Sequence, residues 1–170
     1  MKWYTIDEDF LDYLRNFEKR IPKIDYGDDK LKPFFGSLFE IGDLVYITQV
    51  SHPQKRHINL KEDIDFIKLY DNKRLVAVVN LNYMFPVHKS KLIEIEYGNI
   101  ENFRIFDSEL SKSSYIALLK KEMKQIISKQ VDVKATKLYK RKYDYPDDRV
   151  SKRCIDFKKL EQKCIEYKNK

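Results

Sequence analysis

Residues 33–50, PFFGSLFEIGDLVYITQV, decide the fold that this sequence predicts. Two apolar runs rich in aromatic and β-branched side chains lie on either side of Gly42 and Asp43, and such side chains favour strands. A Gly-Asp pair between two runs of this kind is typical of a β-hairpin turn. The stretch therefore predicts a hairpin whose second strand ends near Val50.

Sequence on both sides extends this hairpin into a larger sheet. Residues 64–87 repeat the pattern around a turn at residues 71–73, and residues 91–97 alternate apolar and polar side chains as a half-buried strand does. Residues 2–6, KWYTI, add a short strand near the start of the chain. We expect a strongly curved antiparallel sheet in the middle of the chain.

Helical spacing dominates the rest of the sequence. Asp7 is positioned to cap a first helix, whose apolar residues recur until Pro22 stops them. A second helical pattern begins near Ser108 and can continue towards Tyr143, with or without a break, and a last helix follows a turn. The order of strand, helix, several strands and then helices predicts one α+β domain over residues 1–170.

Composition and charge indicate a folded protein with a polyanionic partner. Hydrophobic residues make up 42% of the chain and charged residues 36%, so a core forms beneath a highly charged surface. The net charge is +7, but residues 110–170 hold 18 basic and 8 acidic residues, whereas residues 1–109 hold 16 and 19. This asymmetry favours binding to nucleic acid, and a solvated helical face is the alternative.

Several classes of protein are excluded by what the sequence lacks. No apolar run is long enough to span a membrane, and the acidic N-terminal residues do not resemble a signal peptide, so we expect a cytoplasmic protein. Nucleotide-binding, zinc-protease and α/β-hydrolase motifs are absent. Cys154 and Cys164 lack metal-ligand spacing, and the acidic pairs at residues 28–29 and 147–148 read as solvated turns. We expect no cofactor and no metal.

Residues 47–57, ITQVSHPQKRH, follow the predicted hairpin and gather groups that handle phosphate. The Ser51 hydroxyl either bonds a phosphate oxygen or forms a turn with its own backbone, and spacing alone favours the turn. His52 can exchange a proton near neutral pH, and the basic residues after it can bind an anion. When the 2′-hydroxyl of RNA attacks the adjacent phosphate, a protein must position that hydroxyl, remove its proton, stabilise the charge on the phosphorane and protonate the leaving oxygen. Serine, lysine and histidine side chains can do this without a metal ion.

Tyrosine is abundant and often lies beside lysine. The chain holds 12 tyrosines, and residues 137–145, KLYKRKYDY, show the pattern. Aromatic rings on a cationic surface stack the bases of single-stranded RNA, but buried tyrosines equally pack in cores. Tyr139 and Tyr143 are therefore candidates for either role.

Five segments resemble, in order, the ToxN/AbiQ family of endoribonuclease toxins from toxin–antitoxin systems whose antitoxin is a small repeated RNA. They are YTI (4–6), KPFFG with the hairpin ending in VSHPQK (32–55), VNLNYMFPV (79–87), YIALLKKE (115–122) and CIDFKKLEQKCIEYK (154–168). The resemblance implies an α+β domain with a strongly curved, barrel-like antiparallel sheet flanked by helices, similar to MazF/Kid toxins. It also implies metal-independent cleavage of RNA to a 2′,3′-cyclic phosphate.

The resemblance further implies the partners and the biological role. A toxin of this kind cuts its own repeated antitoxin transcript and stays bound to the small pseudoknotted product. The two form a closed protein–RNA hetero-oligomer, such as three proteins with three RNAs. Phage defence by abortive infection is the usual outcome.

The resemblance also implies the residues of the site. Ser51 falls on a hydroxyl-bearing position of the family's segment, and His52 replaces a second hydroxyl. The lysine expected nearby comes one residue later, as Lys55. Either Lys55 or His52 can therefore be the general base. Glu122 replaces a frequent glutamine. The residues that it implies in RNA binding are Lys32, Lys121 and, as the nearest equivalent of a loop tyrosine, Tyr26. Arg56, in the cationic run after Ser51, and Tyr115 are further candidates for RNA binding.

Two rival functions fit parts of this pattern. A non-catalytic RNA- or DNA-binding regulator shares the basic helices and aromatics but has no need for the dense serine, histidine and lysine group. An adaptor for acidic proteins explains the charge but not that group.

Overall fold

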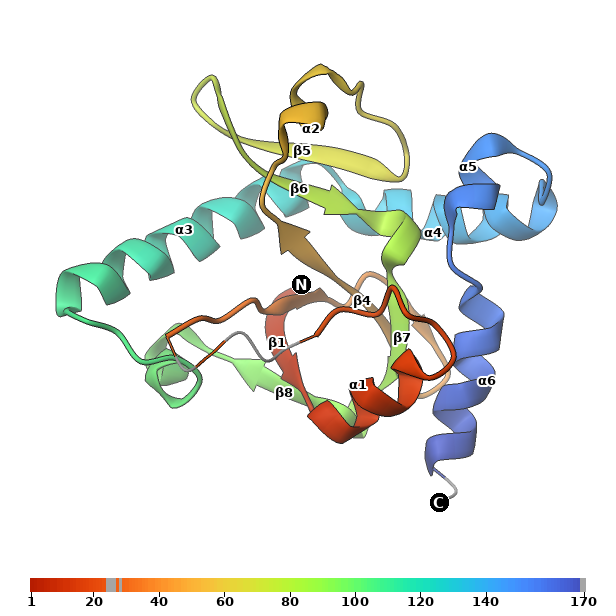
Figure 1. The fold of residues 1–170 in the computed structure, drawn as a ribbon, viewed down its shortest axis with the longest axis horizontal. Coiled ribbons are helices and arrows are strands. Elements are labelled where there is room, and N and C mark those ends of the chain that lie inside the picture. Colours follow the sequence, from red (N-terminus) through yellow and green to blue (C-terminus); the bar gives the residue numbers. More distant parts are fainter. Residues whose placement is uncertain (24–26, 28, 169–170) are drawn as a thin grey trace.

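The computed structural model describes residues 1–23, 27 and 29–168 and confirms the α+β class. Its eight strands form one antiparallel sheet (Figure 1). In chain order they are β1 (Lys2–Ile6), β2 (Phe34–Gly36), β3 (Glu40–Ile41), β4 (Leu44–Ser51), β5 (Phe66–Asp71), β6 (Arg74–Asn80), β7 (Phe85–His88) and β8 (Leu92–Ile95). The strand order is β5-β6-β4-β2-β1-β8, with β3 and β7 also paired to β4. This order has two ends, β5 and β8, so the sheet is open. The expectation of a barrel-like sheet is therefore wrong in that the sheet does not close.

The central strand is β4, which changes partners along both edges. On one edge residues 44–47 pair with β7, and Val50 and Ser51 pair with β6. On the other edge residues 44–45 pair with β3, and Thr48 and Gln49 pair with β2. The predicted 33–50 hairpin is thus confirmed, with its turn at Gly42 (φ 58°), but its first arm is divided between β2 and β3.

Gly36 lies where the first arm of the hairpin is interrupted. A Cβ atom at this position would lie 2.8 Å from Ile47 Cγ2 and 3.1 Å from the Tyr46 carbonyl oxygen. Only glycine therefore allows the two arms to approach this closely. Beyond it, the Leu38 N–H donates to the Tyr46 carbonyl and the Tyr46 N–H donates to the Phe39 carbonyl, so pairing continues irregularly.

The second predicted hairpin, residues 64–87, is correct only in its first part. β5 and β6 pair around a turn that places Asn72 at φ 52°. A 3₁₀ turn, η1 (Leu81–Tyr83), then separates β6 from β7, and β7 pairs with β4 instead of continuing the hairpin.

The helices are α1 (Glu8–Arg15), α2 (Lys55–Asn59), α3 (Glu109–Ser128), α4 (Val131–Asp144), α5 (Arg149–Arg153) and α6 (Phe157–Lys168). The Asp7 carboxylate accepts a hydrogen bond from the Phe10 N–H at 3.0 Å, so the predicted cap is confirmed. The helix after it ends earlier than Pro22, because tight turns follow Arg15. α3 and α4 are separated at Gln130, whose φ of 51° ends the first helix and answers the open question of a break.

The tyrosines of α4 are half-buried and pack against the core. Tyr46 and Tyr139 both donate their hydroxyl protons to Glu161 Oε1, at 2.6 and 2.8 Å. The ring of Tyr139 stacks on Phe157, and the Tyr143 hydroxyl accepts from the Lys158 N–H at 2.8 Å. Of the two roles left open for Tyr139 and Tyr143, these contacts favour packing.

Both cysteines lie in the core. Cys154 is 5% exposed and Cys164 is 1% exposed, and α6 packs against β7 through the latter. Burial raises the pKa of Cys154 to about 11 and that of Cys164 to about 12, so both remain thiols at neutral pH.

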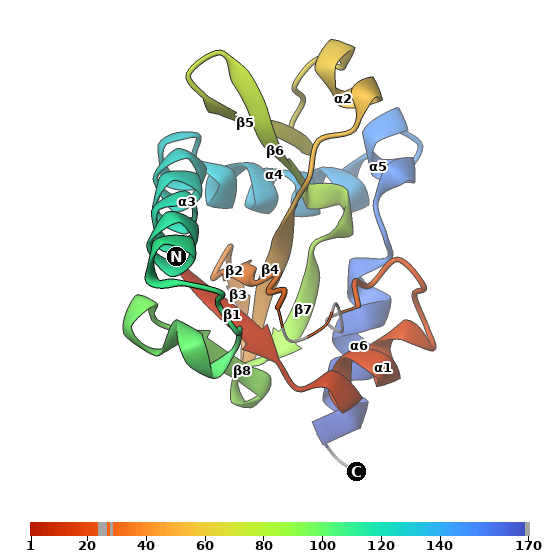
Figure 2. The same ribbon diagram turned by 60° about the vertical axis from the view of Figure 1, so that its left-hand side comes forward.

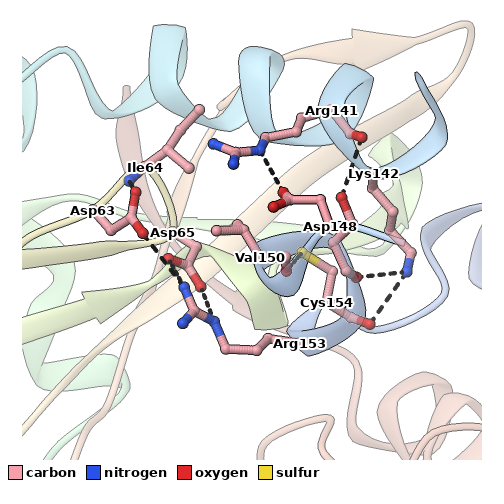
Figure 3. A network of polar contacts seen from close by, with 10 residues as sticks. Asp63, Ile64, Asp65, Arg141, Lys142, Asp148, Val150, Arg153 and Cys154 are labelled. Atoms are coloured by element: carbon pink, nitrogen blue, oxygen red, sulfur yellow. Dashed lines mark hydrogen bonds and ion pairs between the residues drawn. The ribbon is translucent and has the colours of Figure 1, made fainter. Parts of the chain in front are cut away.

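A polar network fixes α5 to the start of β5 (Figure 3). Arg153 donates to both oxygens of Asp65, at 3.0 and 2.8 Å, and Asp65 is 3% exposed. Arg141 donates to Asp148 at 2.6 Å, and Lys142 Nζ donates to two carbonyls of the α5 segment. Part of the positive charge of the last third of the chain therefore stabilises the fold.

Candidate active site at the end of β4

The end of β4 places Ser51 on a rigid part of the sheet. Ser51 is the last residue of this strand and pairs with Val78 of β6. Its side chain and that of His52 are exposed. The predicted position of both residues at the end of a strand is confirmed, and a strand end holds a functional group more firmly than a free loop does.

The basic residues after them form the short helix α2 and not a loop. The Gln54 N–H donates to His57 Nδ1 at 3.0 Å, which closes the first turn. His57 is buried, and its ring lies 5.4 Å from that of Phe66. Burial, together with the charges of Arg56 and Lys68, lowers the pKa of His57. His57 therefore holds α2 on the sheet as a neutral ring and takes no part in the pocket described next.

A pocket of about 110 Å³ opens beside Ser51. Its walls come from five parts of the fold: the end of β4, the segment before β2, strand β1, strand β6, and α3, which lies beside the start of β1 (Figures 1 and 2). The lining residues are Trp3, Leu31, Lys32, Pro33, Val50, Ser51, His52, Val76, Ala77, Tyr115, Leu118, Leu119 and Glu122. The structure thus brings four of the predicted site residues together: Lys32, Ser51, His52 and Tyr115.

The wall that carries Lys32 is fixed at two consecutive carbonyl groups. The Tyr115 hydroxyl donates to the Leu31 carbonyl at 2.8 Å, and Gln49 Nε2 donates to the Lys32 carbonyl at 2.8 Å. The guanidinium of Arg104 lies 4.3 Å from the centre of the Tyr115 ring. Burial raises the pKa of Tyr115 to about 12, so its phenol keeps its proton and its hydrogen bond. Tyr115 therefore positions the segment of Lys32.

The other predicted residues that the structure describes lie outside this pocket. Lys55 lines a second hollow of about 490 Å³, together with Pro53, Gln54, Ile58, Tyr70, Lys73, Arg74 and Leu75. Arg56 is exposed on α2, which projects from the β5–β6 end of the molecule in both ribbon views (Figures 1 and 2). Lys121 forms an ion pair with Asp71 in the β5–β6 turn. Tyr26 lies outside the described residues. The roles in RNA binding or catalysis assigned to these four residues stay predictions.

Two polar groups of the pocket were not predicted from the sequence. Glu122 is only 8% exposed, and burial raises its pKa to about 7. Trp3 is 3% exposed, and its Nε1 has no hydrogen-bond acceptor among the described residues. In the sequence, Glu122 is marked only as the replacement of a frequent glutamine, and Trp3 carries no cation or hydroxyl that would bind phosphate. The signal for Glu122 was its place in the apolar helical stripe of Tyr115, Leu119 and Ile126.

This arrangement fits acid–base chemistry on a phosphate ester. One pocket holds a cation, a hydroxyl, an imidazole and a carboxyl whose pKa is near neutrality. Among the residues that the structure describes, no group of three acidic, histidine or cysteine side chains is placed to bind a metal ion. Within the same residues, no helix has the length and apolar character needed to cross a membrane.

Comparison with known families gives one consistent result. A family profile described as "Toxin ToxN, type III toxin-antitoxin system" matches residues 2–165. Endoribonuclease ToxN of Pectobacterium atrosepticum is 30% identical over 107 residues, which are 60% of this chain and 63% of the relative, so the aligned part spans less than two thirds of that relative. Endoribonuclease ToxN of Bacillus thuringiensis subsp. kurstaki is 26% identical over 170 residues, which are 99% of this chain and 85% of the relative.

Two solved structures share the fold over nearly the full chain. One is AbiQ, a lactococcal anti-phage endoribonuclease belonging to the type-III toxin–antitoxin system, with a TM-score of 0.75, 20% identity and coverage of 99% of this chain and 98% of the other. The second comes from work on selective toxin inhibition by a non-coding RNA pseudoknot in bacterial type III systems, with a TM-score of 0.74, 24% identity and coverage of 99% and 98%. The arrangement of strands and helices is therefore that of these proteins.

Proposed function

Because the chain belongs to the ToxN family of type III toxin–antitoxin systems, we propose that it is an endoribonuclease toxin that a small RNA pseudoknot inhibits. The observation that carries this proposal is the pocket in which Lys32, Ser51 and His52 meet. The relatives named endoribonuclease ToxN and the anti-phage endoribonuclease AbiQ support the activity and a role in phage defence by abortive infection.

The proposed reaction is attack by a 2′-hydroxyl of RNA on the adjacent phosphate, leaving a 2′,3′-cyclic phosphate without a metal ion. The Ser51 hydroxyl would hold a non-bridging phosphate oxygen, since the sheet fixes its backbone beside Val78. Lys32 would stabilise the charge that develops on the phosphorane, because its segment is held by Gln49 and Tyr115. His52 lines the same pocket and is the better-placed candidate for the base, with Lys55 the alternative from the second hollow.

The proposed partner is RNA, both as substrate and as inhibitor. The relative inhibited by a non-coding RNA pseudoknot supports an RNA antitoxin, here a repeated transcript that the toxin cuts and then keeps bound. We place Arg56 and Lys121 among the RNA contacts outside the pocket, and we propose that Tyr26 also contacts RNA. We further propose that protein and RNA form a closed assembly, such as three proteins with three RNAs, and that it acts in the cytoplasm. We also propose that the curvature of the sheet is similar to that of MazF/Kid toxins.

Cleavage of RNA by the purified protein in EDTA tests the proposal. We expect the wild type to cut RNA with EDTA present and to leave ends that resist 3′ ligation until the cyclic phosphate is opened and the resulting phosphate is removed. Ser51→Ala should cut at least a hundredfold more slowly while RNA binding survives. Ser113→Ala, an exposed serine on α3 outside the pocket, is the matched control and should cut like the wild type.

Two outcomes would overturn the assignment. Cleavage that requires added Mg²⁺ would contradict the metal-independent mechanism, and unchanged cleavage by Ser51→Ala would remove Ser51 from the site. RNA binding with no cleavage by the wild type would instead favour the non-catalytic regulator.

A further inference from the structure

Glu122 faces the pocket from α3 as an acidic group among cationic and hydroxyl side chains. It is 8% exposed and lines the pocket with Ser51, His52 and Lys32. Within the described part of the chain, its carboxyl has no hydrogen-bond or ion-pair partner. A buried carboxyl without a partner is costly when charged, so this position is suited to a neutral acid.

The surroundings explain why Glu122 holds a proton. Burial is the cause that raises its pKa to about 7. The titratable and charged groups around the pocket are Lys32 before β2, His52 after β4, and Tyr115 on α3, with Arg104 against the Tyr115 ring. A carboxylic acid with a pKa near the working pH is an efficient proton donor.

We propose that Glu122 is a catalytic residue, the acid that protonates the leaving 5′-oxygen during RNA cleavage. This inference rests on the proposed function of the same pocket. The 2′-oxygen forms a bond to phosphorus and gives its proton to the base, while the bond from phosphorus to the 5′-oxygen breaks. The Glu122 O–H proton passes to that 5′-oxygen. The resulting carboxylate regains a proton from water, and the base returns its proton to water. Atoms and charge balance without a further reactant.

A sulfur substitution in the substrate tests this step directly. The wild type's cleavage site is first mapped, and a short RNA is made with either oxygen or sulfur as the 5′-bridging atom at that site. A thiolate leaves without protonation, so it does not need an acid. Glu122→Gln should cut the oxygen substrate about a hundredfold more slowly than the wild type. On the sulfur substrate, where no acid is needed, the variant should cut within about threefold of the wild-type rate.

The pH dependence of kcat supplies a second readout. For the wild type, kcat should fall as the pH rises through about 7, because the acid form of Glu122 is lost. This falling limb should be absent in Glu122→Gln. Glu122→Asp, which keeps the acid on a shorter side chain, should retain the limb with a lower maximum, and Glu109→Gln, on the exposed first turn of α3, should behave as wild type.

The outcomes separate this inference from the function on which it rests. An equal loss on the oxygen and sulfur substrates, no loss at all, or a wild-type kcat without a falling limb near pH 7 would each overturn the acid role alone. Failure of the wild type to cut any RNA would overturn the proposed function and this role with it.

Discussion

Replacing Glu122 by glutamine is expected to stabilise the protein above neutral pH. Burial raises the pKa of this carboxyl to about 7 from its ordinary value of 4.5. Between these two values the folded protein holds a proton that the unfolded chain has lost. The stability linked to that proton is fully present below about pH 4.5 and is lost as the pH rises through about 7. Glutamine cannot ionise, so the variant avoids this loss.

The size of the effect follows from the pKa change. The interval from 4.5 to about 7, at about 1.36 kcal/mol for each pKa unit, corresponds to about 3 kcal/mol in the free energy of unfolding. For a chain of this length, each kcal/mol moves the Tm by about 2–4 °C, so Glu122→Gln should melt roughly 6–12 °C higher than the wild type at pH 8. Near pH 4.5 the two proteins should unfold alike.

Urea unfolding between pH 4.5 and 9 measures this difference. The wild type, Glu122→Gln and Glu109→Gln are compared at each pH, and Glu109 serves as an exposed glutamate on the same helix. The difference between Glu122→Gln and the wild type should grow with pH up to about 8 and then level off, whereas the control should show little change. A difference that stays constant across this range would refute the reasoning, because it would show that the buried carboxyl does not carry the linked proton.

Three further predictions concern the fold, the pocket wall and the basic surface. Arg153→Ala should lower the free energy of unfolding by about 2 kcal/mol in urea titrations, because it leaves the carboxylate of Asp65 buried and unpaired. The control Lys152→Ala should change the free energy of unfolding by less than about 0.5 kcal/mol, and equal effects of the two variants would contradict the prediction. Tyr115→Phe should reduce kcat/KM for RNA cleavage about tenfold, because the Leu31 carbonyl loses its donor and the segment of Lys32 loosens; unchanged kinetics would contradict this. RNA affinity, measured by fluorescence anisotropy, should fall at least tenfold between 50 and 200 mM salt. An affinity that does not change with salt would show that the positive charge of the last third of the chain serves only the fold and solubility.

The sequence predicted elements wherever local chemistry decides them. The Asp7 cap and the Gly42 turn are confirmed, because each depends on neighbours within a few residues. The first helix is shorter than predicted, since Ile21 continues the apolar spacing but is buried from a turn and not from a helix. Long-range pairing, such as that of β7 with β4, has no local signal.

The pocket was only partly predictable for a related reason. Ser51 and His52 are neighbours in the chain, so their shared position was visible in the sequence. Glu122 belongs to a helix that reaches the pocket only through tertiary packing, and its pKa depends on that packing. A charged residue inside an apolar stripe was the available signal, and it points to a buried ionisable group and not to a particular reaction.

The approach of Lys32 to Ser51 in one pocket depends on an irregularity that a regular hairpin would lack. Near the turn, β3 and β4 pair Ile41 with Leu44, and extending that register would set Phe34 opposite Ser51. The interruption after Gly36 shifts the register by two residues, because β2 instead pairs Phe34 with Gln49. Continued along the chain, this register brings residue 32 opposite residue 51.

Pro33 then keeps that place open. It has no N–H to donate, so pairing with β4 stops at Phe34 and leaves one edge of Val50 and Ser51 without a paired strand in the part of the chain that the structure describes. The pocket forms along this free edge and is closed from the side by α3, with Pro33 in its lining. The close approach of the chain at Gly36 and the missing donor at Pro33 therefore do as much to build the candidate active site as the side chains that would perform the chemistry.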